Sequence, residues 1–284
     1  MVGSTTQSAR AVRCAVVLTH GKPETIGPAL GRLERIAEAS GVELVFPEDE
    51  RMKHGLTEGG TSVQTAELAV VLGGDGTMLR ALQRFLETDI PVVGVNFGRV
   101  GFLATMDEAD MEAGLPHVFA CEYRVAELPA LDVDVGGTHA SAINDVVATS
   151  STLGRMIEVG WAVGGEDLGS QHCDGVICCT PSGSTAYNLS NGGPVLVRGL
   201  EAMAITFVAP HSLHARPLVV PRGSDVTIEN RTPDVGVTVL VDGHPLIEVG
   251  TGDRVTAGLG QRRSLLATLP EVTFFTRYRQ TFGS

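Results

Sequence analysis

The hydrophobic pattern of this chain changes near Glu122, and no other feature restricts the fold as strongly. Before that residue, short continuous apolar runs alternate with stretches of helical periodicity. After it, apolar and polar residues alternate in short segments separated by Gly, Asn and Asp. The first pattern is typical of an α/β domain and the second of antiparallel β structure. The chain of 284 residues is therefore expected to form two domains.

The first region predicts a sheet that is buried on both faces. Its expected strands are residues 15–18, 42–46, 68–72 and 91–95, and its expected helices are residues 25–39 and 78–86. Continuous Val and Leu runs that alternate with helices are typical of a mostly parallel sheet covered by helices. Residues 47–60, which are charged and contain glycine, are expected to form a mobile loop.

The second region predicts a β-sandwich. Its expected strands are residues 131–135, 156–163, 226–229, 237–241 and 254–257, and turn residues follow several of them. We expect an α/β domain at residues 1–122 and an all-β, sandwich-like domain at residues 123–269. The last segment, about residues 270–284, contains several aromatic residues and is expected to pack back on the first domain.

The composition excludes several classes of partner. The formal net charge is −12, whereas nucleic acids and anionic membranes are bound by clustered Lys and Arg, so neither partner is expected. No segment reaches the ~20 apolar residues that span a bilayer, and residues 1–10 are small and polar, typical of a loose terminus. The five cysteines are odd in number and lack zinc-site spacing, which favours reduced thiols in a cytoplasmic protein.

The segment Gly73-Gly74-Asp75-Gly76-Thr77 lies between an expected strand and an expected helix. Exposed backbone N–H groups and the helix dipole make such a junction an anion site, with phosphate as its natural ligand. Asp75 would repel a phosphate unless it acts as a base or through a cation such as Mg²⁺, so its presence favours catalysis of phosphoryl transfer. The alternative is a tight turn in which Asp75 makes only local contacts.

Three further segments carry candidate site residues. Asn96 to Leu103 follows the next expected strand, and Phe102 there either flanks a planar ligand or fills the core. Asn144-Asp145 interrupts an apolar stretch. Considered alone, this pair is more typical of a β-bulge than of a binding site. The segment Cys173 to Pro194 is rich in hydroxyl groups and glycine, which suits hydrogen bonding to ribose and base edges. A solvated Ser/Gly loop is the alternative, although Thr180-Pro181 and Tyr187 are unlike a flexible linker.

Taken together and in this order, these motifs resemble NAD kinases. The resemblance rests on Gly73 to Thr77, Gly98 with Gly101-Phe102-Leu103, Asn144-Asp145 and Asp174-Gly175 through Thr180 to Pro194, and Ala215 to Leu218 and Val241-Asp242-Gly243 also fit. It spans about residues 12–275. It implies an α/β domain, a β-sandwich that binds NAD, a site between them, and phosphorylation of the adenosine 2′-hydroxyl of NAD to give NADP.

The resemblance also implies roles for individual residues. Asp75 would be the base or the acid that organises a metal, with Gly74 and Gly76 shaping its loop. Asn144 and Asp145 would hold nucleoside hydroxyls, and Asp242 is a weaker candidate for nucleotide binding. The adenosine region would be lined by Phe102, Ser182, Thr185, Ala186 and Tyr187, whereas Asp174 and Ser190 would face the rest of the dinucleotide.

The same resemblance gives the expected reactants and assembly. The donor is ATP or inorganic polyphosphate, with Mg²⁺ or another divalent cation bound to the phosphates and not directly to protein ligands. A homodimer or homotetramer is expected, and a neighbouring subunit can complete the site.

Two positions depart from the family pattern. Asp145 stands where the family usually has Glu, and the lost methylene withdraws the carboxylate by roughly 1.5 Å, which weakens a direct ribose contact. His172 occupies a position linked to the choice between NAD and NADH, where a basic residue accompanies NAD preference and a small one accompanies acceptance of both. His172 is either an intermediate case or a surface histidine.

Two other functions compete with this interpretation. A lipid kinase of the diacylglycerol or sphingosine type shares the Gly-Gly-Asp-Gly-Thr loop, but the net charge of −12 and the long hydroxyl-rich segment disfavour it. A non-catalytic regulator that binds a dinucleotide is the other alternative, motivated by Asp145. Binding of NAD without turnover would distinguish the regulator from the kinase.

Overall fold

The computed structural model describes residues 11–21, 23–56, 63–98 and 101–283, with the backbone alone for 23–25. The expected loose terminus at residues 1–10 and the positions of Arg99 and Val100 lie outside these ranges. The chain divides into two compact units. Unit 1 contains residues 1–127 and 264–284, and unit 2 contains residues 128–263.

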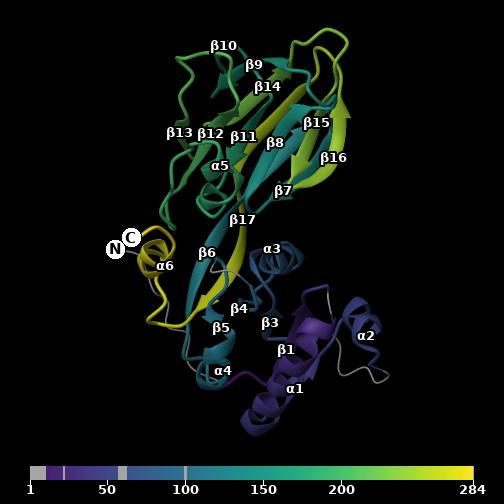
Figure 1. The fold of residues 1–284 in the computed structure, drawn as a ribbon, viewed down its shortest axis with the longest axis vertical. Helices are drawn as coiled ribbons and strands as arrows, with labels where there is room; N and C mark the ends of the chain where they lie inside the picture. Colours follow the sequence, from purple (N-terminus) through teal and green to yellow (C-terminus); the bar gives the residue numbers. More distant parts are fainter. Residues whose placement is uncertain (1–10, 22, 57–62, 99–100, 284) are drawn as a thin grey trace. The chain divides into compact units, whose positions relative to one another are not determined.

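Unit 1 is built on a parallel sheet (Figure 1). Its strands are β1 (Cys14–Thr19), β2 (Glu43–Val45), β3 (Leu68–Leu72), β4 (Val92–Asn96), β5 (Met106–Asp107) and the end of β17 (Arg254–Thr268). They lie in the order β17-β4-β3-β1-β2, with β5 also paired to β4, and every one of these pairs is parallel. The carboxyl ends of β3 and β4 therefore meet at one edge, where ligands bind open α/β sheets.

Helices cover both faces of this sheet. The helices of unit 1 are α1 (Pro23–Ser40), α2 (Glu48–His54), α3 (Asp75–Arg84), α4 (Met111–Phe119) and α6 (Phe274–Phe282), with 3₁₀ turns η1 (Val63–Thr65) and η2 (Glu108–Asp110). Alternate strand residues such as Val17, Val70 and Val93 share a buried cluster with α1 and α4. The residues between them face the other way, and there Gly94 leaves room for Met78 of α3.

Two expectations for unit 1 were wrong in detail. The expected loop at residues 47–60 contains α2, because three acidic residues in its first turn and three basic residues in its last turn complement the helix dipole. Gly55 ends α2 with φ +65°, a conformation that favours glycine; residues 57–60 lie outside the described ranges. The helix expected from residue 78 begins at Asp75, which places that residue in the first turn of α3.

Unit 2 is an antiparallel β structure with two sheets. One contains β9 (Ile157–Val163), β10 (Glu166–Cys173), β14 (Val226–Asn230) and the first part of β17, together with β6 (Arg124–Val135) and β7 (Thr138–Ala142). The other has the order β13-β12-β11-β8-β15-β16. Its strands are β8 (Asp145–Ser150), β11 (Gly175–Cys179), β12 (Ala202–Val208), β13 (Leu218–Pro221), β15 (Val237–Val241) and β16 (His244–Val249).

The two sheets of unit 2 share one core. A single buried cluster includes Val133, Val159 and Val226 from the first sheet and Val146, Val176 and Val239 from the second. This arrangement confirms the expected fold class, an α/β unit with a mainly parallel sheet followed by an antiparallel β unit. The short strands are joined by tight turns, such as Gly136-Gly137 and Gly164-Gly165, whose φ angles are positive as hairpin turns of this length require.

The two positions at which the chain passes from one unit to the other fall within the long strands β6 and β17. The expected domain boundary near Glu122 falls just before β6, and the observed division follows Glu127 within that strand. After β17 the chain ends in α6, which belongs to unit 1. Among the described residues, no helix is long and apolar enough to cross a membrane.

Candidate active site

The glycine-rich loop after β3 leads directly into α3. Gly74 is the N-cap of this helix, and its carbonyl accepts hydrogen bonds from the N–H groups of Thr77 and Met78. A Cβ on Gly73 would lie 2.6 Å from Thr77 Oγ1, so this turn needs glycine at that position. The N–H groups of the first helical turn and the positive end of the helix dipole favour an anion here. The loop lies between a strand and a helix as expected, and phosphate binding at this junction stays a prediction.

The carboxylate of Asp75 is held by the backbone of residues 101–105, which we call the 101–105 loop. Its Oδ2 accepts from Phe102 N at 2.8 Å, and its Oδ1 accepts from Leu103 N at 3.2 Å and Ala104 N at 3.4 Å. A carboxylate has about four lone-pair sites. Three are directed at N–H groups, so among the described residues about one lone pair, on Oδ2, remains for another partner. A Cβ on Gly101 would overlap this carboxylate, which explains the glycine there.

A second arrangement of the same kind occurs in unit 2, at the turn between β7 and β8. We call residues 143–145 the 143–145 corner. The carboxylate of Asp242 accepts from Ile143 N at 2.8 Å, Asn144 N at 2.7 Å and Asp145 N at 3.0 Å. Asp242 and Gly243 form the two-residue turn between β15 and β16, both with positive φ. Asp145 begins β8 and Asn144 lies in the turn before it, so the bulge interpretation was wrong.

Asp145 is a buried carboxyl group, 6% exposed. Burial and, to a lesser extent, the neighbouring negative charge of Asp242 together raise its pKa to about 7. Its position at the start of β8 follows from pairing with Cys179 of β11. A carboxyl group with this pKa exchanges its proton near neutral pH, and it can accept a hydrogen bond from a ligand hydroxyl once ionised.

The hydroxyl-rich segment after β11 lies against the 143–145 corner. Thr180 Oγ1 donates to Ile143 O at 2.6 Å, and Thr180 N donates to Asn144 O at 2.9 Å. A Cβ on Gly183 would overlap the carbonyl of Asn144, so the close approach needs glycine. Within the described residues, the buried atoms Asn144 Oδ1 and Ser182 Oγ have no hydrogen-bond partner. Buried polar atoms normally do have one, so these two atoms are available to a polar ligand.

The remaining residues of this segment form two short helical turns, η3 (Gly183–Thr185) and α5 (Tyr187–Ser190). Thr185 Oγ1 donates to Ser182 O at 3.2 Å, and Ala186 is half-buried between the two turns. The side chains of Tyr187 and Ser190 are exposed. Close local hydrogen bonding makes this segment a built structure and not a flexible linker.

His172 and Asp174 lie elsewhere in unit 2. Strand β11 pairs Gly175 with Thr149 and Cys179 with Asp145, so Asp174 stands at the opposite end of the strand pair from Asp145. About 13 Å of strand separates the two ends. His172 is exposed on β10, with Nε2 3.8 Å from Glu158 Oε2. One copy of unit 2 therefore does not bring these two residues to the 143–145 corner.

Phe102 is buried, and its ring lies against α6 within unit 1. Its centroid is 5.9 Å from that of Phe274 and 5.7 Å from that of Phe282. Of the two sequence-based alternatives for Phe102, the structure shows the core position for its ring, while its N–H group holds Asp75.

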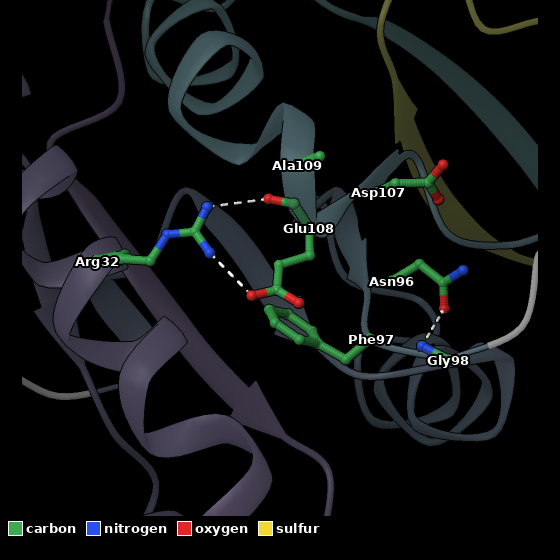
Figure 2. Close-up of a pocket in the computed structure, with 7 residues that line it drawn as sticks. All are labelled: Arg32, Asn96, Phe97, Gly98, Asp107, Glu108 and Ala109. Carbon is green, nitrogen blue, oxygen red and sulfur yellow. Dashed lines mark hydrogen bonds and ion pairs between the residues drawn. The ribbon is translucent and has the colours of Figure 1, made fainter.

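Unit 1 also contains a cavity of about 590 Å³ at the carboxyl end of β4. Figure 2 shows its lining residues: Arg32, Asn96, Phe97, Gly98, Asp107, Glu108 and Ala109. Arg32 donates to the side chain and the carbonyl of Glu108, so its charge is already compensated inside the protein. Asn96 Oδ1 accepts from Gly98 N at 3.0 Å. None of the residues assigned from the family resemblance lines this cavity.

Sequence reasoning missed three groups that shape the two sites. They are the N–H groups of the 101–105 loop on Asp75, the hydroxyl of Thr180, and the side chain of Arg277, which donates to Ala104 O and Thr105 O. Thr180 ends a buried strand and could have been found from its position. The other contacts join distant segments and leave no local signal. Within the described ranges, no group of three or more His, Cys, Asp and Glu side chains is arranged to bind a metal.

Comparison with known proteins places this geometry in a family. The ATP-NAD kinase N-terminal domain matches residues 38–123, and the ATP-NAD kinase C-terminal domain matches residues 143–268. An NAD kinase of Lachnoclostridium phytofermentans is 34% identical over 279 residues, covering 94% of this chain and 98% of that protein. The chain belongs to the NAD kinase family. Its enzyme class is accordingly that of a phosphotransferase.

Other relatives agree with this assignment. An NAD kinase of Heliobacterium modesticaldum is 40% identical over 219 residues, covering 75% of this chain and 77% of that protein. The crystal structure of an NAD kinase from Archaeoglobus fulgidus in complex with ATP has a TM-score of 0.74 and 26% identity over 95% of this chain and 97% of the other. Yeast NADH kinase complexed with NADH shares the fold, with a TM-score of 0.82 and 21% identity over 96% and 89%.

Proposed function

We propose that this NAD kinase family member transfers the terminal phosphoryl group of ATP, or of inorganic polyphosphate, to the adenosine 2′-hydroxyl of NAD and so produces NADP. In this proposal each unit binds one reactant, the Gly73–Thr77 loop the donor and the 143–145 corner the acceptor. The observation that supports it most is the Asp75 carboxylate, which lies at a helix N-terminus and keeps about one lone pair free after three backbone contacts.

The proposed reaction requires one proton acceptor. The oxygen of the 2′-hydroxyl forms a bond to the terminal phosphorus of the donor, and the bond from that phosphorus to the bridging oxygen breaks. Asp75 Oδ2 takes the hydroxyl proton, and ADP or the shortened polyphosphate leaves with the bridging oxygen. Because the three N–H groups fix the carboxylate, it needs little reorganisation to accept that proton.

The donor phosphates would lie at the start of α3. Gly74 and Gly76 allow a phosphate to approach the backbone, since a Cβ at Gly76 would meet open space and no protein atom. A divalent cation such as Mg²⁺ would neutralise the phosphates when bound. An Mg²⁺ ion that is carried by phosphates and water needs only one or two carboxylates. In this proposal the remaining lone pair of Asp75 accepts the hydroxyl proton, so the phosphates and water would carry the ion.

The acceptor side would use the polar atoms of the 143–145 corner. Asn144 Oδ1 and Ser182 Oγ are buried without partners in the described structure and would hydrogen-bond the nucleoside. Ionised Asp145 would accept from a ribose hydroxyl, and Asp242 would keep the corner in place. Thr185, Ala186 and Tyr187 would line the adenosine. The roles of Asn144, Ser182 and Asp145 explain why this corner is polar although it is buried.

A homodimer or homotetramer would explain the position of the other family residues. His172 and Asp174 lie at the opposite end of β11 from Asp145, so in this proposal a second copy supplies them, with Ser190, to the dinucleotide bound by the first. Light scattering after size exclusion measures the assembly. An active monomer would contradict the shared site.

The deciding experiment is a donor-by-acceptor matrix. Purified protein receives ATP or polyphosphate, with NAD or NADH, in the presence of Mg²⁺ or of EDTA, and NADP or NADPH is measured. We expect NADP from NAD with at least one donor and a loss of that activity in EDTA. If the folded protein forms neither product with either donor, the proposal is wrong. Calorimetric binding of NAD without turnover would then favour the regulator, and phosphorylation of diacylglycerol would favour the lipid kinase.

We also propose a cytoplasmic location. The five cysteines are free, and four of them are buried in the structure. Free thiols are typical of a reducing compartment. Cell fractionation tests this, and recovery in an oxidising compartment would contradict it.

A further inference from the structure

The 101–105 loop is held from both sides within unit 1. Its N–H groups at Phe102, Leu103 and Ala104 contact the Asp75 carboxylate. Its carbonyl groups contact Arg277 of α6, whose Nη2 donates to Ala104 O and Thr105 O at 3.0 Å each. Ala104 is thus fixed at both ends, its N–H by Asp75 and its carbonyl by Arg277. A short chain of hydrogen bonds connects Asp75 to a helix at the C-terminal end of the sequence.

Arg277 is an unusual residue to find in this place. It is 6% exposed, and its Nε has no hydrogen-bond partner among the described atoms. Its Nη1 lies 4.0 Å from Asp107 Oδ1 and donates to Gln280 Oε1 at 3.4 Å. Burying a guanidinium group costs free energy that an apolar side chain of similar size would not cost. The hydrogen bonds of Arg277 are therefore better explained by a role in positioning the 101–105 loop than by a contribution to the stability of the fold.

The rest of α6 supports the same loop through apolar contacts. The ring centroids of Phe274 and Phe282 lie 5.9 and 5.7 Å from that of Phe102. Thr105 is fixed separately, because its N donates to Gly94 O and its Oγ1 donates to Ala267 O. The aromatic contacts place α6 against the loop, and Arg277 then sets the direction of the carbonyl groups at Ala104 and Thr105.

We propose that Arg277 is a positioning residue for phosphoryl transfer. It acts through the 101–105 loop, which directs the free lone pair of Asp75 Oδ2 toward the hydroxyl that is phosphorylated. This inference rests on the proposed function of Asp75. Without the guanidinium, the carbonyl groups of Ala104 and Thr105 lose their donor, the N–H groups of the loop turn away, and the carboxylate is no longer fixed.

The test begins with Arg277→Met, which keeps a long side chain but has no hydrogen-bond donor. We expect kcat for NADP formation to fall at least about tenfold, because small displacements of a reacting group have effects of this size. The KM for NAD should change less than about threefold, since the acceptor is bound by other residues. Arg279→Met is the matched control, because Arg279 lies on the same helix with an exposed side chain.

A double-mutant cycle separates positioning from general damage. Asp75→Asn, Arg277→Met and the double variant are compared. If Arg277 acts through Asp75, the Arg277 substitution changes the residual rate of Asp75→Asn by less than about twofold. A purely structural effect would lower the rate by the same factor in both backgrounds, and that result would overturn the proposal. Equal kcat values for Arg277→Met and Arg279→Met would overturn it as well.

Amide hydrogen exchange gives a readout that does not need activity. We expect exchange of residues 102–104 to be faster in Arg277→Met than in the wild type, with the strands of unit 2 unchanged; unchanged exchange at 102–104 contradicts the proposal. If Arg277→Met does not fold, Arg277→Lys replaces it in both tests, with a smaller fall in kcat that again disappears beside Asp75→Asn. An inactive wild type would refute the proposed function, and the exchange result would still decide whether Arg277 holds the loop.

Discussion

Asp75 in unit 1 and Asp242 in unit 2 use their carboxylates in the same way, since each accepts hydrogen bonds from three consecutive backbone N–H groups. The units differ in which residue has the proposed role toward the ligand. In unit 1 the anchoring carboxylate is also the proposed proton acceptor. In unit 2 the anchor is Asp242, and the proposed ligand-binding carboxylate is Asp145, which is buried with a pKa raised to about 7. One unit combines anchoring and chemistry in one residue, and the other divides them.

The largest effect is expected in unit 1, where one substitution removes both roles. In Asp75→Asn the amide keeps one acceptor oxygen, presents an NH₂ group to the loop, and cannot take the hydroxyl proton. We expect kcat for NADP formation to fall at least ~100-fold, as loss of a general base should. Asp89→Asn, at an exposed position of the same unit, is the control. Near-normal turnover by Asp75→Asn would remove Asp75 from the proposed role.

In unit 2 the anchor can be removed without removing the ligand-binding carboxylate. Asn at position 242 tolerates the φ of +47° but leaves one of the three N–H groups facing an NH₂ group. We expect the free energy of unfolding of unit 2 to fall by about 2 kcal/mol and the KM for NAD to rise about tenfold. Trp161, the single Trp, lies in β9 and reports unfolding of unit 2 in urea.

The control for Asp242→Asn is Asp234→Asn, because Asp234 is an exposed aspartate with φ +56° in the same unit. Equal stability of the two variants would show that the contacts of Asp242 to the 143–145 corner contribute little. The two units would then differ more than their matching geometry suggests.

The pH dependence of stability tests the proposed state of Asp145, the ligand-binding carboxyl group of unit 2. Because the folded-state pKa of Asp145 is raised, the unfolded chain loses this proton first, and the wild type loses stability as the pH rises from about 4 to about 7. Asp145→Asn has no such proton to lose. We expect the free energy of unfolding of Asp145→Asn minus that of the wild type to increase by at least about 1 kcal/mol from pH 5 to pH 8. A constant difference across this range, measured by Trp161 fluorescence, would contradict the raised pKa.

The smallest effect is expected when the family's usual residue is restored. Asp145→Glu moves the carboxylate outward by roughly 1.5 Å, and we expect the KM for NAD to fall about two- to threefold with kcat unchanged. The measurement is a steady-state titration of NAD at saturating donor. A higher KM would mean that the buried corner is shaped for aspartate and that the shorter side chain is no handicap.

Local patterns predicted those parts of the fold that depend on neighbours in sequence. The apolar run Leu68–Leu72 located β3, the glycines after it located the loop before α3, and the pattern of residues 237–241 located β15. The edge strands β10, β13 and β16 of unit 2 were not predicted. Strand β10 is largely exposed and reads Glu-Asp-Leu-Gly-Ser-Gln-His-Cys, so it has no apolar alternation to detect. Helix α2 was missed because its signal is charge placement and not hydrophobic periodicity.

The candidate sites were predicted as residues but not as contacts. Asp75, Asn144 and Asp145 stand out through their neighbours in sequence. The partners that hold them come from far away, since Asp242 is 99 positions from Ile143 and Arg277 is 173 positions from Ala104. Such pairs are created by the order of strands in each unit, and no periodicity of a single segment encodes them. The same reason explains why Asp242 looked like a ligand-binding residue and turned out to face the backbone.

The division of unit 1 between two parts of the sequence has a consequence for synthesis of the protein. A chain emerges from the ribosome N-terminus first, so unit 2, which is continuous from residue 128 to 263, is complete before unit 1. The loop beside Asp75 receives Arg277 only after residue 277 has been made. A chain cut short by a late stop codon would contain every glycine and aspartate of the family motifs, yet its 101–105 loop would lack one of its two supports.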